Sequence, residues 1–256
     1  MSDLVLLQPV GDGVLRLTLN RPQALNALDR GLTAALEEAV ERVAALADVR
    51  VLLVCGHGRA FCAGNDIKEM RSFTGDDAQA LATRHAALMD RFAQLPQVTL
   101  AVLDGHALGG GLMLAVAQDL RIASDRARLG LPEVTLGFNP GYGVARFLDV
   151  VGGAHGRDLL LSGRTVHASE ALRMGLVNRV VAPPTLEASA LKWAGEIAAS
   201  PREGLAATKQ VVRAIRTGQA GGEPAAYGAA LRTSAAARAR IDAFAGRRTT
   251  RPRDSS

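Results

Sequence analysis

The sequence has few aromatic residues and no long uncharged run. Phe, Trp and Tyr make up 4% of the 256 residues, whereas 46 residues are alanine, so small and aliphatic side chains should fill the core. No segment approaches the roughly 18 apolar residues of a membrane-spanning helix. The amino terminus carries Asp3 and no basic stretch, which is not typical of a secretory signal. We therefore expect a cytoplasmic globular protein without a membrane partner.

Cysteine, lysine and several common site motifs are also scarce or absent. Cys55 and Cys62 are too few for a disulfide framework, and we expect them to be reduced core thiols. The chain has three lysines and no GxxxxGK[ST], GxSxG, HExxH or GxGxxG pattern, and its five histidines form no i, i+4 pair. The sequence therefore predicts neither a P-loop, nor a dinucleotide fingerprint, nor a metal site.

The formal net charge of +5 is concentrated at the carboxyl end. Residues 232–256 contain seven arginines and two aspartates, whereas the rest of the chain has 23 basic and 23 acidic residues. A basic tail indicates at most a contact with an anion, whereas nucleic-acid binding usually requires a basic face on a folded domain. We therefore expect no nucleic acid as a partner, and we expect residues 247–256 to form a mobile basic tail.

Strand and helix patterns alternate through the first part of the chain. This alternation predicts right-handed βαβ units and a mostly parallel sheet, that is, an α/β core over residues 1–184. After Pro183-Pro184 only helical patterns follow, which predicts a helical region over residues 185–246. The strand patterns lie at 14–20, 49–55 and 98–103, and the helical patterns of the core lie at 28–43, 77–95 and 110–118.

Two glycine-rich turns follow buried strands. GHGRAFCAGNDIKEM at 56–70 comes after the strand at 49–55, and DGHALGGGLML at 104–114 comes after the strand at 98–103. Ligand sites of α/β proteins form at the carboxyl ends of adjacent parallel strands, and glycine lets a ligand approach backbone N–H groups closely. Either turn alone is more often just a tight connection between a strand and a helix. Together they favour a site in which two amides stabilise an oxyanion.

Five segments carry a resemblance to a known family. They are LNRPQALNAL at 19–28, AFCAGNDIKEM at 60–70, DGHALGGG at 104–111, LPEVTLGFNPGYG at 131–143 and SEALRMGLVNRVV at 169–181. In this order they resemble the crotonase superfamily, the enoyl-CoA hydratase/isomerase family. The resemblance implies an α/β spiral of ββα repeats with an all-helical carboxyl-terminal region for pocket closure and oligomerisation. It also implies a homotrimer or hexamer.

The resemblance further implies an acyl-CoA thioester substrate and no separate cofactor, because coenzyme A is part of the substrate. The backbone N–H groups of Asn65 and Gly110 would form the oxyanion hole for the thioester oxygen. Lys68 fits a phosphate contact and a solvated helix-start charge equally well, and Asp66 also suits a turn-stabilising role. The residues expected to bind coenzyme A or the acyl group are Gln23, Ala24, Leu25, Ala63, Asp66, Ile67, Lys68, Met113 and Tyr142.

The carboxylates decide which reaction is expected. Hydratases of the family generally use two glutamates, and Glu133 matches the second of them. The first would lie two residues after Gly111, where this chain has Met113, which can neither accept nor donate a catalytic proton. One carboxylate beside an oxyanion hole can still move a proton from one carbon to another. The resemblance thus favours a Δ3,Δ2-enoyl-CoA isomerase with Glu133 as the single catalytic acid/base.

Two other interpretations remain open. The chain could be a hydratase, or catalyse other enolate chemistry such as C–C cleavage or decarboxylation, with a non-standard group in place of the missing glutamate. Tyr142 is one candidate for that group, although a role as a wall of the acyl pocket suits it better. Alternatively, the chain could bind acyl-CoA without activity, against which the presence of Glu133 and both glycine turns argues.

Overall fold

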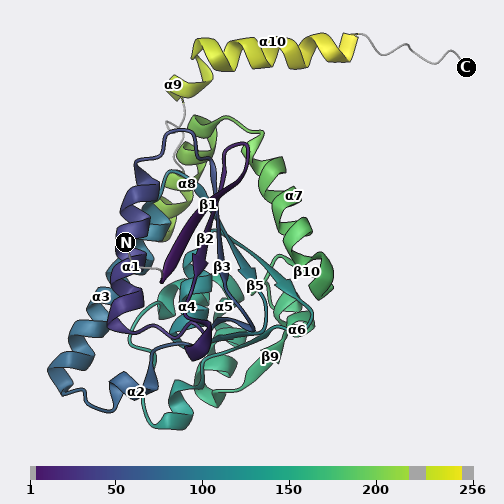
Figure 1. The fold of residues 1–256 in the computed structure, drawn as a ribbon. Coiled ribbons are helices and arrows are strands. Elements are labelled where there is room, and N and C mark those ends of the chain that lie inside the picture. Colours follow the sequence, from purple (N-terminus) through teal and green to yellow (C-terminus); the bar gives the residue numbers. More distant parts are fainter. Residues whose placement is uncertain (1–3, 219–228, 250–256) are drawn as a thin grey trace, which may run out of the picture. The chain divides into compact units, whose positions relative to one another are not determined.

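The computed structural model describes residues 4–218 and 229–249, and the chain divides into two units after Ser200 (Figure 1). Within the described residues, the first unit contains the strands and the helices α1 to α7, and the second contains the helices α8 to α10. Each unit is described by itself.

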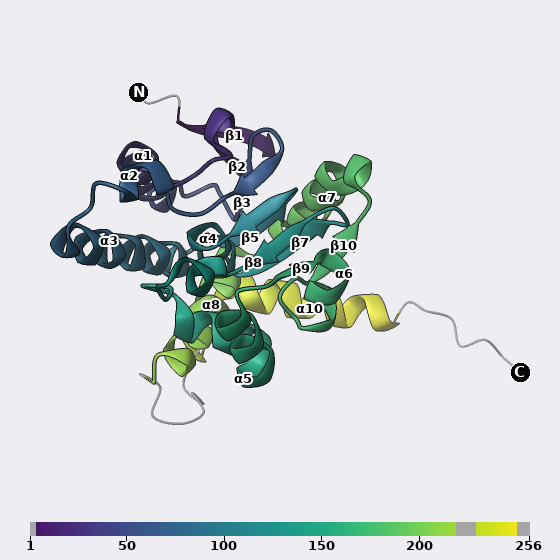
Figure 2. The same cartoon turned by 90° about the horizontal axis from the view of Figure 1, so that it is seen from below.

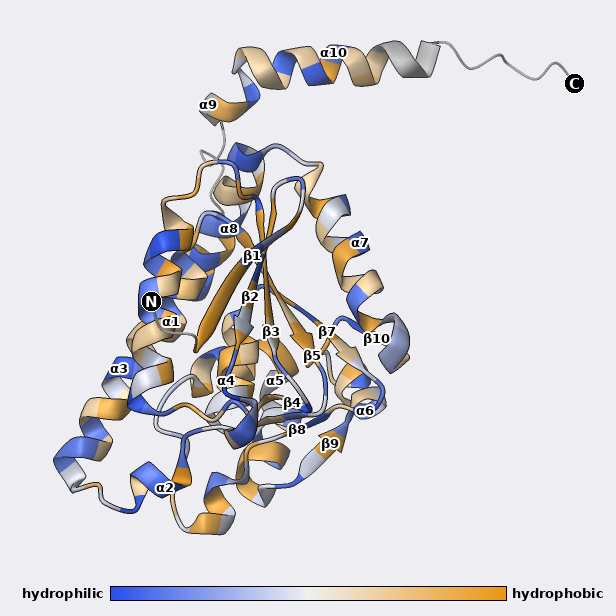
Figure 3. Cartoon of the chain, in the orientation of Figure 1, coloured by the Kyte–Doolittle hydropathy of each residue, from blue (hydrophilic) through white to orange (hydrophobic). Residues whose placement is uncertain are grey.

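The main sheet of the first unit has six strands in the order β1-β2-β3-β5-β7-β10. The pair β1/β2 is antiparallel, and the other neighbours are parallel, which confirms the mostly parallel sheet. Its central strands are predominantly apolar, as buried parallel strands are (Figure 3). The strands are β1 (Val5–Gly11), β2 (Val14–Leu19), β3 (Val51–Gly56), β5 (Val98–Leu103), β7 (Leu120–Ser124) and β10 (Arg179–Val181).

A second sheet has four short strands in the order β4-β6-β8-β9. They are β4 (Ala60–Cys62), β6 (His106–Leu108), β8 (Arg128–Gly130) and β9 (Thr165–His167). Strand β4 lies within the first glycine-rich turn and β6 within the second, and the two strands pair in parallel. The second sheet therefore brings the two turns side by side.

The helices of the first unit complete a repeated ββα order, which confirms the expected spiral. The α-helices are α1 (Arg30–Ala44), α2 (Ile67–Met70), α3 (Gly75–Gln94), α4 (Gly110–Ala117), α5 (Val144–Ser162), α6 (Ala168–Arg173) and α7 (Leu186–Ala198). The 3-10 helices are η1 (Pro22–Ala24), η2 (Pro132–Leu136) and η3 (Pro183–Thr185). Helix α1 begins after Asp29, which caps it: the side chain accepts a hydrogen bond from Leu32 N at 2.7 Å.

The two faces of the main sheet bury different clusters. Leu15, Leu17 and Leu19 of β2 point into the larger core, which includes residues of α1, α3, α4 and α5. Val14 of the same strand belongs to the second cluster, together with Trp193 of α7. Helix α7 lies along the main sheet (Figure 2). Because strand side chains alternate, one strand serves both cores.

Helix α7 belongs structurally to the α/β unit. It contacts β1, β2, β3, β5 and β7, and its Leu186, Ala190 and Ala194 are buried against the sheet. The sequence places this helix in the helical region that starts at 185, whereas the structure divides the chain after Ser200. The difference arises because the apolar side of α7 covers a sheet face.

The second unit is helical in its described part, with α8 (Arg202–Arg216), α9 (Ala229–Arg232) and α10 (Ala235–Thr249). The helical carboxyl-terminal region is therefore confirmed. Helix α10 includes the first residues of the expected tail, and residues 250–256 lie outside the described part of the chain. None of the helices in the described ranges is long and apolar enough to cross a membrane.

Candidate active site

The two glycine-rich turns approach each other at backbone distance. A Cβ atom on Gly64 would lie 2.8 Å from Leu108 O, and one on Gly111 would lie 2.2 Å from Cys62 O. Gly64 also has a φ of +103°, which favours glycine. Side chains at these positions would therefore push the turns apart, so the glycines keep the backbones of residues 62–65 and 108–111 in contact.

The backbone amides of Asn65 and Gly110 lie in these turns and have no acceptor among the described residues. Leu28 N donates to Gly64 O at 2.8 Å and Asp66 N donates to Leu28 O at 3.0 Å, which fixes the backbone on either side of Asn65. Within the described residues, neither Asn65 N nor Gly110 N donates a hydrogen bond. Gly110 is the first residue of α4, where helical N–H groups have no intrahelical partner. Asn65 and Gly110 line the same cavity of about 50 Å³.

Glu133 lines that cavity as well. It lies in η2 with 9% of its surface exposed, and a Cβ atom on Gly109 would lie 2.9 Å from its Oε1. Its Oε2 is buried without a hydrogen-bond partner among the described residues. Burial raises the pKa of Glu133 above its ordinary value, because a desolvated carboxylate is less stable than the neutral acid. The group therefore suits the reversible transfer of a proton.

An adjoining cavity of about 20 Å³ is lined by Glu133, Met113 and Tyr142. Met113 lies on α4 with 2% of its surface exposed, and a Cβ atom on Gly143 would lie 2.9 Å from its Sδ. The hydroxyl group of Tyr142 donates to Asn65 Oδ1 at 3.1 Å. Of the described residues that line the two cavities, Glu133 is the one with a carboxyl group.

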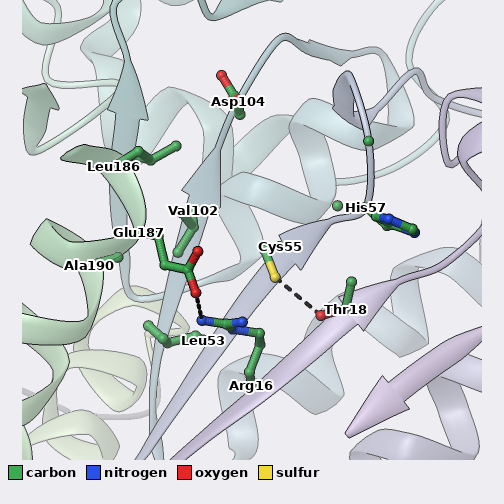
Figure 4. Close-up of a pocket in the computed structure, with 12 residues that line it drawn as sticks. Arg16, Thr18, Leu53, Cys55, His57, Val102, Asp104, Leu186, Glu187 and Ala190 are labelled. Carbon is green, nitrogen blue, oxygen red and sulfur yellow. Dashed lines mark hydrogen bonds and ion pairs between the residues drawn. The ribbon is translucent and has the colours of Figure 1, made fainter. Parts of the chain in front are cut away.

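A larger cavity of about 290 Å³ lies on the α7 face of the main sheet (Figure 4). Its charged groups are paired: Arg16 with Glu187, and Asp104 with Arg126. Burial raises the pKa of the Cys55 thiol, so a thiolate nucleophile is disfavoured there. We therefore place the candidate active site at Glu133, whose carboxyl oxygen Oε2 is unpaired.

Comparison with known proteins shows the family of the chain. The family model described as enoyl-CoA hydratase/isomerase matches residues 10–248. The chain belongs to the enoyl-CoA hydratase/isomerase family. This family corresponds to the crotonase superfamily that the five sequence segments resemble.

Relatives and solved structures of the enoyl-CoA hydratase/isomerase family match most of the chain. The putative enoyl-CoA hydratase/isomerase YngF of Bacillus subtilis (strain 168) is 39% identical over 223 residues, 85% of this chain and 84% of that protein. A probable enoyl-CoA hydratase of Rhizobium meliloti (strain 1021) is 42% identical over 199 residues, 77% of each chain. A crystal structure of an enoyl-CoA hydratase from Mycobacterium smegmatis has a TM-score of 0.89 and 32% identity, covering 96% of this chain and 97% of that one.

In this member of the enoyl-CoA hydratase/isomerase family, the structure brings most of the predicted site residues together. Those that line the two cavities are Ala63, Asn65, Ile67, Gly110, Met113, Glu133 and Tyr142. They come from segments that follow β4, β6 and β8 and from the loop before α5. The second sheet and the start of α4 thus gather groups that are distant in the sequence.

Five other predicted residues do not line these cavities. Gln23, Ala24 and Leu25 lie in and directly after η1, and Ala63 N donates to Leu25 O at 3.0 Å, so this segment borders the site. Asp66 caps α2 and forms an ion pair with Arg21 at 2.7 Å. This pairing lowers the pKa of Asp66 despite its burial. The remaining residue, on the first turn of α2, is the exposed Lys68.

Sequence reasoning missed several residues of the site. Met70, Leu136 and Phe138 line the first cavity, and Leu136 and Phe138 are exposed at 59% and 40%. Leu136 and Phe138 lie three and five residues after Glu133 in the sequence. Apolar side chains so close to the expected catalytic carboxylate could have been predicted to line the acyl pocket. Sequence reasoning also missed His85, whose Nδ1 lies 3.1 Å from the Tyr142 hydroxyl oxygen, and Thr33, whose Oγ1 lies 2.9 Å from His85 Nε2. No local pattern connects these residues with Tyr142.

Proposed function

We propose that this family member is an acyl-CoA enzyme whose single carboxylate, Glu133, moves a proton between two carbons of an enoyl thioester. One observation carries the proposal: of the described residues that line the two cavities, Glu133 has the carboxyl group, and Met113 lines one of them where the family resemblance would put a second glutamate. This arrangement favours Δ3,Δ2-enoyl-CoA isomerisation. Coenzyme A would enter as part of the substrate, with its pantetheine arm between residues 23–25 and 63–68.

The chemistry follows from the positions of three groups. The Glu133 carboxylate takes a proton from C2 of a 3-enoyl thioester, and the electron pair moves through the carbonyl onto the thioester oxygen. The free amides of Asn65 and Gly110 donate hydrogen bonds to that oxygen. Protonated Glu133 then returns the proton to C4, which yields the 2-enoyl thioester and restores the carboxylate.

Hydration is the second candidate, because relatives such as the Rhizobium meliloti protein are named enoyl-CoA hydratases. The two reactions are distinguished by incubating the protein with 3-enoyl and 2-enoyl thioesters and separating the products by liquid chromatography, with detection by enoyl absorbance and by mass. Isomerisation gives a separate, conjugated product of unchanged mass, whereas hydration adds one water and removes the enoyl absorbance. Fast hydration together with slow isomerisation would overturn the single-carboxylate proposal, and turnover of neither would favour an acyl-CoA-binding protein.

Restoring the second carboxylate should raise hydration. We expect Met113→Glu to increase the hydration rate of a 2-enoyl thioester by about tenfold or more from a low baseline, since a second carboxylate can activate water. Met113→Gln is the matched control, because it has a similar size and no ionisable group. The rates are measured by loss of enoyl absorbance. Equal rates for the two variants would show that a carboxylate at this position does not limit hydration.

We also propose that copies of the chain assemble through the second unit as a trimer or hexamer. Val212 and Ile215 on α8, and Ile241 and Phe244 on α10, are each more than half exposed. On each helix the two residues are three positions apart and share one face, and exposed apolar patches mark interaction surfaces. Light scattering should therefore give three or six times the 26.8 kDa of one chain, and Val212→Glu should lower that mass. A monomer mass for the unaltered protein contradicts this prediction.

A further inference from the structure

A chain of hydrogen bonds runs from the interior of the first unit to the candidate active site. Thr33 Oγ1 of α1 lies 2.9 Å from His85 Nε2 of α3. His85 Nδ1 lies 3.1 Å from the hydroxyl oxygen of Tyr142, and that hydroxyl donates to Asn65 Oδ1 at 3.1 Å. Thr33 and His85 are fully buried, and Tyr142 is 9% exposed. Three side chains from separate segments therefore form a line that ends at Asn65, whose backbone amide lies in the candidate active site.

The chemistry of these groups gives the chain one direction. Asn65 Oδ1 accepts only, so the Tyr142 hydroxyl proton points to it. The tyrosine oxygen then accepts from His85 Nδ1–H, and His85 Nε2 accepts from the Thr33 hydroxyl. Burial lowers the pKa of His85 to about 4, so the ring is neutral at physiological pH. The position of its one N–H on Nδ1 follows from the partners of the two ring nitrogens.

The Tyr142 and Asn65 end of this series of hydrogen bonds lies against Gly110, whose amide also has no acceptor among the described residues. A Cβ atom on Gly110 would lie 2.4 Å from the Tyr142 hydroxyl oxygen and 2.6 Å from Asn65 Oδ1. The ring of Tyr142 also packs edge-on against His85, with centroids 5.3 Å apart. The network thus sets where Asn65 lies relative to Gly110.

We propose that Thr33, His85 and Tyr142 form a positioning network that holds Asn65 so that its amide and that of Gly110 converge on one oxygen atom. The inference rests on the proposed function, and it assigns Tyr142 a task besides lining the acyl pocket. Burial raises the pKa of Tyr142, which keeps the phenol a neutral donor rather than a proton carrier. The series of hydrogen bonds also ends at the buried Thr33, which offers no route for a proton to solvent.

Removing the links singly and together tests the network. Tyr142→Phe keeps the ring and loses the hydroxyl, and we expect kcat to fall about tenfold with KM changed less than twofold, because one hydrogen bond is lost. His85→Leu should cause a similar loss, and the double variant should be no worse than Tyr142→Phe alone. His85→Asn, whose amide can replace the Nδ1–H donor, should restore part of kcat. Additive losses, or a raised KM with kcat unchanged, would overturn the proposal.

A matched pair of threonine variants separates the network from general stability. Thr33→Val removes the hydroxyl group that donates to His85 Nε2. We expect a twofold to threefold loss of kcat, of the order of a weak hydrogen bond. Thr18→Val removes a comparable bond, to Cys55 Sγ at 3.3 Å on the α7 face (Figure 4), and should leave kcat unchanged. Equal losses in the two variants would indicate a structural effect and not positioning.

A spectroscopic measurement makes the network testable apart from turnover. The carbonyl stretch of bound butyryl-CoA, followed by difference infrared spectroscopy, should shift to lower frequency on the unaltered protein and less on Tyr142→Phe. A shift that is smaller on Tyr142→Phe, without turnover of any enoyl thioester, would reject the proposed reaction and support the network. Equal shifts on both proteins would reject the network, whatever the reaction.

Discussion

Glu133→Gln should lower kcat by about 10²–10⁴-fold, the usual contribution of a general acid/base. Glutamine keeps the shape of the side chain but cannot take a proton, and of the described residues lining the two cavities none offers another carboxyl group. Binding of a non-reacting acyl-CoA, measured by calorimetry, should change little, because the proposed contacts with the thioester come from backbone amides. Glu69→Gln is a suitable control, since Glu69 lies on α2 and pairs with Arg30. Turnover within threefold of the unaltered protein would contradict the assignment.

The pH dependence of turnover by the unaltered protein, and of the stability of Glu133→Gln, gives an independent test of the assignment. Burial raises the pKa of Glu133, so the acid limb of kcat/KM should have its midpoint above the ordinary 4.5. The native state then binds this proton more tightly than the unfolded state. Stability from this group is fully present below pH 4.5 and is lost as the pH rises through the native pKa. Glu133→Gln should therefore raise the melting temperature at neutral pH, and this gain should shrink in acid.

The longer helices and strands could be predicted because each buries apolar side chains that recur with a regular spacing in the sequence. The stripe at 28–43 became α1, and the apolar runs at 49–55 and 98–103 became β3 and β5. The strands of the second sheet are three residues long, too short to show a period, so none was predicted. Their pairing is a tertiary event that depends on close contact between glycine-rich backbones.

The candidate site was predictable only where residues lie in a recognisable segment. Glu133 and Gly110 come from such segments, and the structure places both on one cavity. His85 was not predictable, because a histidine on the apolar side of α3 has no partner within its own helix. Its contacts, Thr33 and Tyr142, are 52 and 57 residues away in the chain. Such long-range hydrogen bonds leave no local mark in a sequence.

The glycines of the second turn lead to the last expected result. Gly110 combines two requirements: its amide is free, and its Cα faces the Tyr142 hydroxyl and Asn65 Oδ1 at distances that leave little room for a side chain. A substitution at Gly110 can add a Cβ atom, remove the backbone N–H donor, or do both, so two variants are needed to separate these effects. Proline and alanine separate them, because both add a Cβ atom and proline alone removes the N–H.

Gly110→Pro should lower kcat by a further 10²–10³-fold, about the loss for one oxyanion-hole donor, compared with Gly110→Ala. Both variants bring the same crowded Cβ contact with Tyr142 and Asn65. Proline adds no helix penalty to it, because Gly110 is the first residue of α4, where the N–H has no helical acceptor and proline is favoured. Melting temperatures of the two variants should therefore be similar, while steady-state kinetics with an enoyl thioester should separate them. If the variants turn over at the same rate, the Gly110 amide does not stabilise the developing oxyanion, and the charge must be held by Asn65 or by another donor.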